Sequence, residues 1–195
     1  MFRRIAPTVA LVALLLVPGS ASAATPAVDI NGNQRAFVPS TITISYGNGI
    51  AWNNNSSLHH TATADVLNLW DVDLPHNSSG GYTFERAGGF AYHCTIHGGM
   101  RGTVLVQMSS SDTTPVVGQM ITITFAVNAA PSGFTEQIQK RKAGGTWKTY
   151  ANSASTSVTW TPPAARTFQF RARLKRVSDG TFTGWSPILQ MTVAP

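Results

Sequence analysis

The chain has 195 residues, 43% of them hydrophobic and 11% charged, with a formal net charge of +6 at pH 7. This length is enough for one domain or for two small ones. The basic charge comes without an aromatic–basic stacking motif, which argues against a nucleic-acid-binding protein.

Residues 1–24 predict a secretory signal peptide. A short basic start, Met1-Phe2-Arg3-Arg4, precedes an apolar run over 5–17 and the small residues Ala21-Ser22-Ala23. We place cleavage after Ala23 or Ala24, with an uncleaved anchor as the alternative. The apolar run is too short to span a bilayer stably. The mature protein is therefore expected outside the cytoplasm, secreted, periplasmic or at the cell surface, with no membrane span.

The charge is distributed unevenly between two halves of the remaining chain. Residues 25–108 carry three Lys or Arg and five Asp or Glu, a net charge of −2, whereas residues 109–195 carry nine and three, a net charge of +6. Between them, 109–115 is small, polar and ends in proline, which is typical of a linker. We predict a first domain over 25–108 and a second over 116–195. The basic charges of the second domain are expected to form a solvated face, and binding to an anionic wall polymer, membrane surface or acidic protein is the alternative.

Strand patterns occur in both halves, and no stretch has a convincing helical period. In the first half, strands are expected at 40–45, 50–52, 81–84, 90–93 and 102–108. In the second half they are expected at 120–127, 136–141, 155–160, 167–174 and 188–193. Many short strands separated by turn residues predict an all-β protein made of β-sandwiches.

The single cysteine, Cys94, lies in a stretch with two other soft donors. His97 follows it by three residues and Met100 by six. A lone cysteine cannot form an intramolecular disulfide, and an unprotected thiol outside the cell oxidises. Two histidines, a cysteine and a weak axial methionine are the ligands of blue copper sites. The second histidine would come from His59-His60, upstream.

In these residues the first half resembles the cupredoxin family, the small blue copper proteins such as plastocyanin and amicyanin. The resemblance covers 28–108, and its segments follow in family order at 37–44, 49–54, 60–63, 88–97 and 100–104. It implies a Greek-key β-sandwich with one type 1 copper per chain. It also implies the metal ligands, with His60 selected over His59: His60, Cys94, His97 and axial Met100.

Two departures from the family fall next to the implied ligands. Thr61 stands where many members carry an asparagine that ties the two ligand loops, and Gly98-Gly99 stand where amicyanin-type loops carry proline. Both changes predict a less rigid ligand loop.

Three further histidines are expected to stay outside this site. His93 should point away from the metal because side chains alternate along a strand. Its alternative is a second copper centre, as in copper nitrite reductases, which would need histidines from another domain, and 109–195 contain none. His59 is expected to be a loop residue and His76 a turn residue. Weak secondary metal binding by His59, His76 or His93 stays open.

The second half resembles a fibronectin type III-like module, an immunoglobulin-like β-sandwich. The resemblance rests on 158–162, 167–173 and 184–187, with Phe168 where the family often has a tyrosine. It implies a spacer or a binding domain, for a cell-surface component or a protein.

The sequence as a whole favours an exported carrier of single electrons rather than an enzyme. Its partner would be a redox protein, with His97 as the point of electron transfer and Met100 tuning the potential. Two alternatives stay open: an extracytoplasmic copper-delivery protein without electron transfer, and a part of a copper oxidoreductase.

Overall fold

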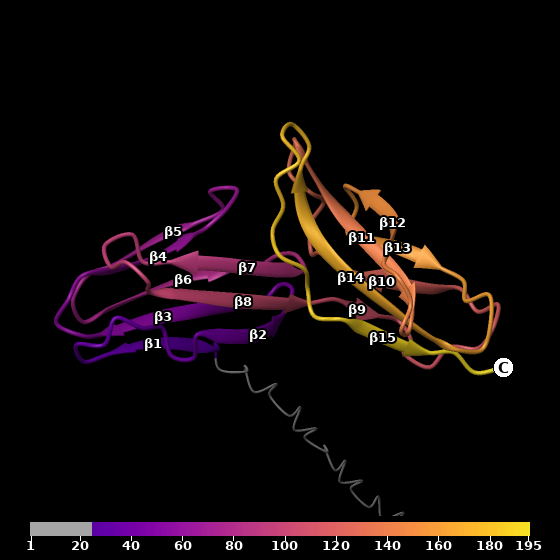
Figure 1. Cartoon of the computed structure of the whole chain (residues 1–195), viewed down its shortest axis with the longest axis horizontal. Helices are drawn as coiled ribbons and strands as arrows, with labels where there is room; N and C mark the ends of the chain where they lie inside the picture. The colour runs from indigo at the N-terminus through magenta and orange to yellow at the C-terminus, as the bar shows by residue number, and fades with distance from the viewer. Residues whose placement is uncertain (1–24) are drawn as a thin grey trace, which may run out of the picture.

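The computed structural model describes residues 25–195, so the predicted signal peptide lies outside the described residues. Two β-sandwiches lie end to end along the long axis of the molecule (Figure 1). Residues 25–195 contain strands and turns but no helix, and hence no helix that is long and apolar enough to cross a membrane. The prediction of an all-β fold is confirmed.

The first sandwich packs a three-stranded sheet, β1-β3-β6, against a five-stranded sheet, β2-β8-β7-β4-β5. Side chains alternate between the two faces of each strand, and those that face inward form the core. Ile50 and Trp52 of β3 and Val104 of β8 point inward and are at most 1% exposed. Phe37 and Tyr92 pack beside them. The strands are β1 (Ala27–Asn31), β2 (Thr41–Ser45), β3 (Gly49–Asn55), β4 (His60–Ala64), β5 (Asp71–Leu74), β6 (Ser78–Thr83), β7 (Gly88–His93) and β8 (Arg101–Gln107).

The second sandwich packs a three-stranded sheet, β13-β10-β9, against a four-stranded sheet, β12-β11-β14-β15. Its core contains Ile123, Ile138, Trp160 and Phe170, all from inward positions of alternating strands. The strands are β9 (Ser109–Ser110), β10 (Ile121–Thr124), β11 (Phe134–Lys142), β12 (Lys148–Ser153), β13 (Ser157–Trp160), β14 (Thr167–Arg176) and β15 (Leu189–Thr192). β1, β4, β5, β9 and β12 have no counterpart among the predicted strands.

The segment predicted as a linker, 109–115, lies along the second sandwich. Ser109–Ser110 form β9 and pair with β10. Further on, the N–H of Thr192 donates to the carbonyl of Thr113 at 3.0 Å, and that of Ala194 to the carbonyl of Pro115 at 2.9 Å. The chain therefore passes from β8 into the second domain with almost no free length.

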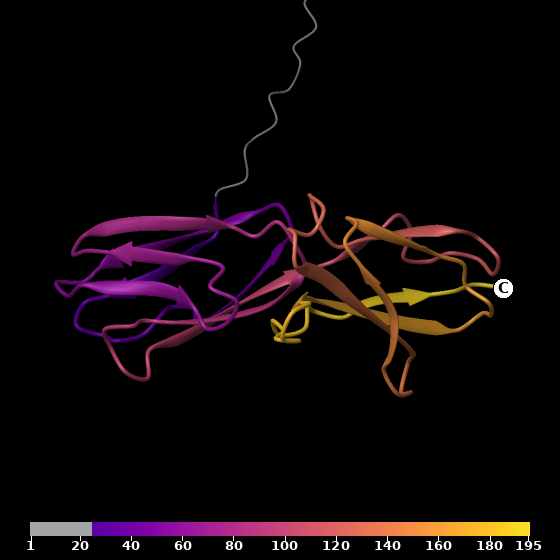
Figure 2. The same cartoon turned by 90° about the horizontal axis from the view of Figure 1, so that it is seen from above.

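The two sandwiches also meet at a seam away from this connection (Figures 1 and 2). Gly89, in β7, and Gly184, between β14 and β15, exchange two main-chain hydrogen bonds of 2.8 and 2.7 Å. A Cβ at Gly89 would lie 2.8 Å from the carbonyl oxygen of Trp185, so this approach requires glycine. Beside these bonds, Arg86 of the first domain donates to the buried Glu136 of the second at 3.2 Å.

The basic charge of the second domain includes a ladder on the outer face of its four-stranded sheet. The guanidinium of Arg171 lies 4.3 Å from the ring centroid of Trp147 and 4.1 Å from that of Trp185. Arg173 lies 4.1 Å from Trp185 and 3.5 Å from Phe182. These arginines stack between aromatic faces, a cation–π arrangement, instead of forming the fully solvated face that the sequence suggested.

Candidate metal centre

The ends of two neighbouring strands bring the predicted ligands together. His60 is the first residue of β4, Cys94 follows the last residue of β7, and Met100 precedes the first residue of β8. Because β4 and β7 are antiparallel neighbours, the start of one lies beside the end of the other. In Figure 1 this end of β7 points away from the second domain. The site therefore lies at the free end of the first sandwich.

The sulfur of Cys94 faces both histidine rings. Its Sγ lies 3.8 Å from Nδ1 of His60 and 3.6 Å from Nδ1 of His97. The donor atoms of the three residues all lie within 4.8 Å of one another. Cys94 is 3% exposed, His60 is fully buried, and His97 is half-buried. Three soft or borderline donors thus converge in a site that is closed except on the side of His97.

The spacing of these donors fits a single metal ion. Nitrogen and sulfur atoms bound to one first-row ion at about 2.0–2.3 Å lie roughly 3.5–3.8 Å apart at tetrahedral to trigonal angles. The observed separations of 3.6 and 3.8 Å agree with this. The main chain of Met100, a residue only 1% exposed, is held beside Cys94 because the N–H of Cys94 donates to the Met100 carbonyl at 3.0 Å. Imidazole, thiolate and thioether are the donors that favour copper.

The two ligand loops are joined through the hydroxyl of Thr61. The N–H of Thr95 donates to Oγ1 of Thr61 at 2.9 Å, and the hydroxyls of these two residues lie 3.1 Å apart. The N–H of Thr61 also approaches Sγ of Cys94 at 3.4 Å, the geometry of a bond to the thiolate. A threonine hydroxyl therefore makes the connection for which the resemblance implied an asparagine. Gly99 has a φ of +82°, and no heavy atom lies within 4 Å of a Cβ placed there; the lower rigidity of this loop stays a prediction.

A buried polar network, which the sequence reasoning missed, supports His60 from behind. Nε2 of His60 lies 3.2 Å from the hydroxyl of Ser56, which donates to Oδ1 of Asn54 at 2.7 Å. The fully buried Asn54 in turn donates to the carbonyls of Leu58 and Leu74, both at 2.8 Å. Asn54 occupies the next inward-facing position of β3 after Ile50 and Trp52. A polar amide at an inward-facing position was the sequence signal that could have indicated this network.

The environment of His60 favours the neutral form of its ring. Burial is the main cause that lowers the pKa of His60 below its usual 6.5, and the nearby charges of His97, His59 and Arg35 lower it further. A neutral imidazole has a lone pair to give to a metal, so the site is ready to bind over a wider pH range than a solvated histidine.

The other histidines of the described chain are engaged elsewhere. Nδ1 of His93 lies 2.6 Å from Asp65, which also accepts from Arg101 at 3.1 Å. His59 pairs with Asp73, and His76 contacts the carbonyl of Ser56. Within residues 25–195, the group of His, Cys or acidic residues that can hold a metal is the one at Cys94.

A β-sandwich with two histidines, a cysteine and a methionine at one end defines a cupredoxin, a protein with a type 1 copper site. No family model matches the chain. It is 33% identical over 104 residues to the chloroplastic plastocyanin of Tetradesmus obliquus, covering 45% of this chain and 70% of that protein. It is 32% identical over 84 residues to the plastocyanin of Scenedesmus fuscus, covering 36% and 86%. The chain belongs to the plastocyanin family.

Solved structures of cupredoxins also match part of the chain. A purple cupredoxin from Nitrosopumilus maritimus matches with 21% identity and a TM-score of 0.40, covering 42% of this chain and 99% of that one. A reduced amicyanin mutant matches with 26% identity and a TM-score of 0.39, covering 45% and 87%. From the donor set and the family, copper is the cofactor of this site, with one ion per chain.

Proposed function

We propose that this protein is an exported carrier of single electrons, with His60, Cys94, His97 and Met100 as its copper ligands. The observation that carries the proposal is the buried convergence of Cys94, His60 and His97, with donor separations of 3.6 and 3.8 Å. Copper supplies the one-electron change between Cu(I) and Cu(II). The protein supplies a frame that holds the donors in one arrangement for both oxidation states.

The residues around the ligands support this frame. The bond from Thr95 to Thr61 fixes the loop after Cys94 against β4. Ser56 and Asn54 fix the ring of His60 from the other side. Because these hydrogen bonds join the ligands to the surrounding strands, little rearrangement is expected with a change of charge, which is the condition for fast electron transfer.

Electrons are expected to pass through His97. Among the three converging donors, His60 and Cys94 are buried, whereas His97 is half-buried. Ile96 beside it is 49% exposed, and no heavy atom lies within 4 Å of a Cβ placed at Gly98. A redox partner protein would therefore dock against the loop of His97.

Copper loading of the purified protein tests this function. With Cu(II), the protein should show intense visible absorption from the thiolate, and Cys94→Ser should abolish it. His93→Gln is the matched control, because His93 is the neighbouring residue and pairs with Asp65 instead. Two coppers per chain, or loss of the band in the control, would favour an oxidoreductase site. A colourless copper-loaded protein would overturn the proposal, and slow self-exchange with ready copper release would favour delivery.

We further propose that residues 1–24 direct export and that the second domain is a fibronectin type III-like spacer or adhesion module. Three- and four-stranded sheets packed face to face support the second part, since seven strands are the number in immunoglobulin-like sandwiches. N-terminal sequencing of the mature protein should begin at Ala24 or Thr25.

A further inference from the structure

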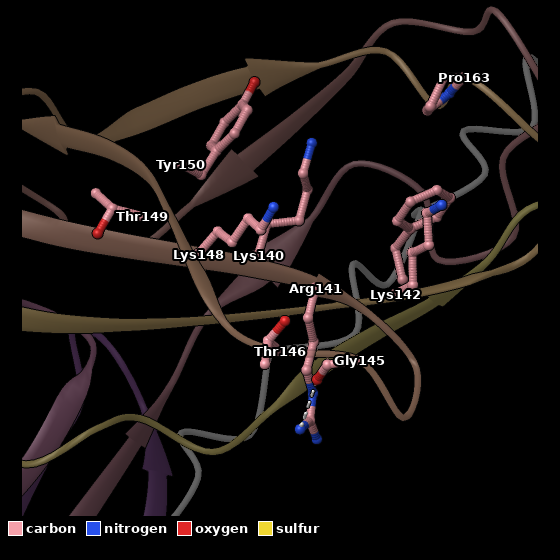
Figure 3. A pocket seen from close by; sticks show the side chains of 10 residues that line it. Lys140, Arg141, Lys142, Gly145, Thr146, Lys148, Thr149, Tyr150 and Pro163 are labelled. Carbon is pink, nitrogen blue, oxygen red and sulfur yellow. Dashed lines mark hydrogen bonds between the residues drawn. The ribbon is translucent and has the colours of Figure 1, made fainter.

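The second domain contains a basic pocket that the copper site does not use (Figure 3). It is a cavity of about 560 Å³ at the hairpin of β11 and β12. This volume lies in the range of small-molecule sites, roughly 300–1,000 Å³. Its lining residues are Lys140, Arg141, Lys142, Gly145, Thr146, Lys148, Thr149, Tyr150, Pro163 and Phe168.

Three lysines lie around this pocket without a carboxylate partner. Lys140 and Lys142 come from β11 and Lys148 from β12. Of the lining residues none is acidic, and the ion pairs found in residues 25–195 do not include these lysines. Arg141 is different, because it points to the other face of the hairpin in Figure 3 and donates to the carbonyl of Gly145.

Three arginines of the same domain are engaged by other side chains. Arg171 and Arg173 stack on aromatic rings and donate to glutamines, Arg171 to Gln139 and Arg173 to Gln137. Arg176 pairs with Asp179 at 3.0 Å. The pocket lysines have no such polar partner, so their charge is left for a ligand.

The position of Lys140 shows why a ligand with negative charge would be favoured. Its ammonium lies 4.7 Å from the ring centroid of Tyr150 and 5.4 Å from that of Trp160, at the edge of the core. Burial lowers the pKa of Lys140. An anion bound beside Lys140 would favour the charged ammonium, which burial disfavours.

The walls indicate the rest of the ligand. Pro163, the buried Phe168 and Tyr150 give the pocket an apolar side, and the hydroxyl of Tyr150 is already bound to the carbonyl of Thr159. Thr146 and Thr149 add hydroxyl donors at the rim. A phosphate monoester matches this arrangement, because it carries nearly two charges and three acceptor oxygens for ammonium groups.

We propose that this pocket binds the phosphate group of a small organic phosphate monoester, with the organic part against Tyr150, Pro163 and Phe168. The proposal does not rest on electron transfer, since the pocket and the donor cluster belong to different sandwiches.

Titration of the full mature protein in its Cu(I) form with phenyl phosphate tests this, followed by NMR of the backbone amides. Shifts should concentrate in 140–150 and at Phe168. The double variant Lys140→Gln/Lys148→Gln should bind at least about tenfold more weakly, because charge-assisted hydrogen bonds are lost. Lys175→Gln removes one charge from β14 outside the pocket and should leave binding unchanged.

Other outcomes decide against the proposal. Absence of shifts in the pocket, or equal weakening by Lys175→Gln, would overturn it and leave only a general attraction of a basic domain. Equal affinity for inorganic phosphate would overturn the role given to the apolar wall. Backbone amide shifts of the second sandwich away from the substituted residues, unchanged in the ligand-free variants, show that this domain is still folded.

Discussion

Replacement of Glu136 by glutamine should change how the stability of the protein depends on pH. Glu136 is fully buried at the seam between the domains. One of its oxygens accepts from Arg86 at 3.2 Å, whereas Oε2 has no hydrogen-bond partner. Burial raises the pKa of Glu136 from 4.5 to about 7, although the charge and hydrogen bond of Arg86 act in the opposite direction. The seam is therefore formed more favourably with a neutral Glu136.

The size of the effect follows from this pKa. A rise from 4.5 to about 7, at about 1.4 kcal/mol per pH unit, corresponds to roughly 3 kcal/mol. A raised folded-state pKa means that the stabilisation is complete below pH 4.5 and is lost as the pH rises through 7. The wild-type protein should thus lose up to about 3 kcal/mol of unfolding free energy over this window, and Glu136→Gln should not.

Urea unfolding of the copper-free, reduced protein between pH 5 and 8.5 measures this difference. His60 titrates with the opposite sign, because its folded-state pKa is lowered and its stabilisation is lost as the pH falls. Both proteins share His60, so subtraction of the two curves isolates Glu136. The reasoning would be refuted if the difference in unfolding free energy between the two proteins changed by less than about 0.5 kcal/mol over the whole pH range.

Arg86→Met gives an independent check on the same pair. Without the guanidinium, the pKa of Glu136 should rise further, and the pH window of instability should move upward. Above that window the variant leaves a buried charge without its partner, at a cost of about 3–5 kcal/mol. The double variant Arg86→Met/Glu136→Gln should recover most of this loss, since neither charge is then left unpaired.

Two substitutions near the copper site have definite expected effects. Thr61→Val removes the acceptor of the Thr95 N–H and should lower the stability of the copper-free protein by about 1–3 kcal/mol in urea unfolding. Thr43→Val, at an exposed position of β2, should cost under about 1 kcal/mol, and equal losses would contradict the role of the tie. Gly102→Ala should cost about 1–3 kcal/mol in the same assay, because a Cβ there overlaps the ring of Tyr92, which lies opposite in the sheet and is fully buried. An unchanged unfolding midpoint would mean that this ring can move.

The sequence predicted best the contacts between residues that lie close together in the chain. Cys94, His97 and Met100 lie within seven residues and one loop, so their convergence needed only the strand before and the strand after them. The tie from Thr95 to Thr61 was not predictable in this way. It depends on the register of β4 against β7, in which Thr63 lies opposite His93 and brings Thr61 beside Thr95. A side chain of different length can make the same connection once that register is set.

Contacts between distant segments were beyond the reach of the sequence. Gly89 and Gly184 are separated by most of the second domain, and neither carries a side chain that would indicate a partner. Lys140 was assigned correctly to a strand, and Lys142 lies one residue beyond the predicted end of that strand; the alternation of β11 places both on the side of the core. At the end of β11 the core gives way to an open pocket, where lysines replace apolar residues.

Strand β7 runs from the seam between the two sandwiches to the donor cluster. It begins at the seam, where Gly89 bonds to Gly184, and its last residue directly precedes Cys94, the sixth residue after Gly88. An extended strand of this length spans roughly 20 Å, which is more than twice the Debye length in physiological salt. The second sandwich thus holds the first from the end opposite to the donor cluster, as Figure 1 shows. A redox partner at His97 and a ligand in the basic pocket would therefore bind to opposite parts of the molecule without competing.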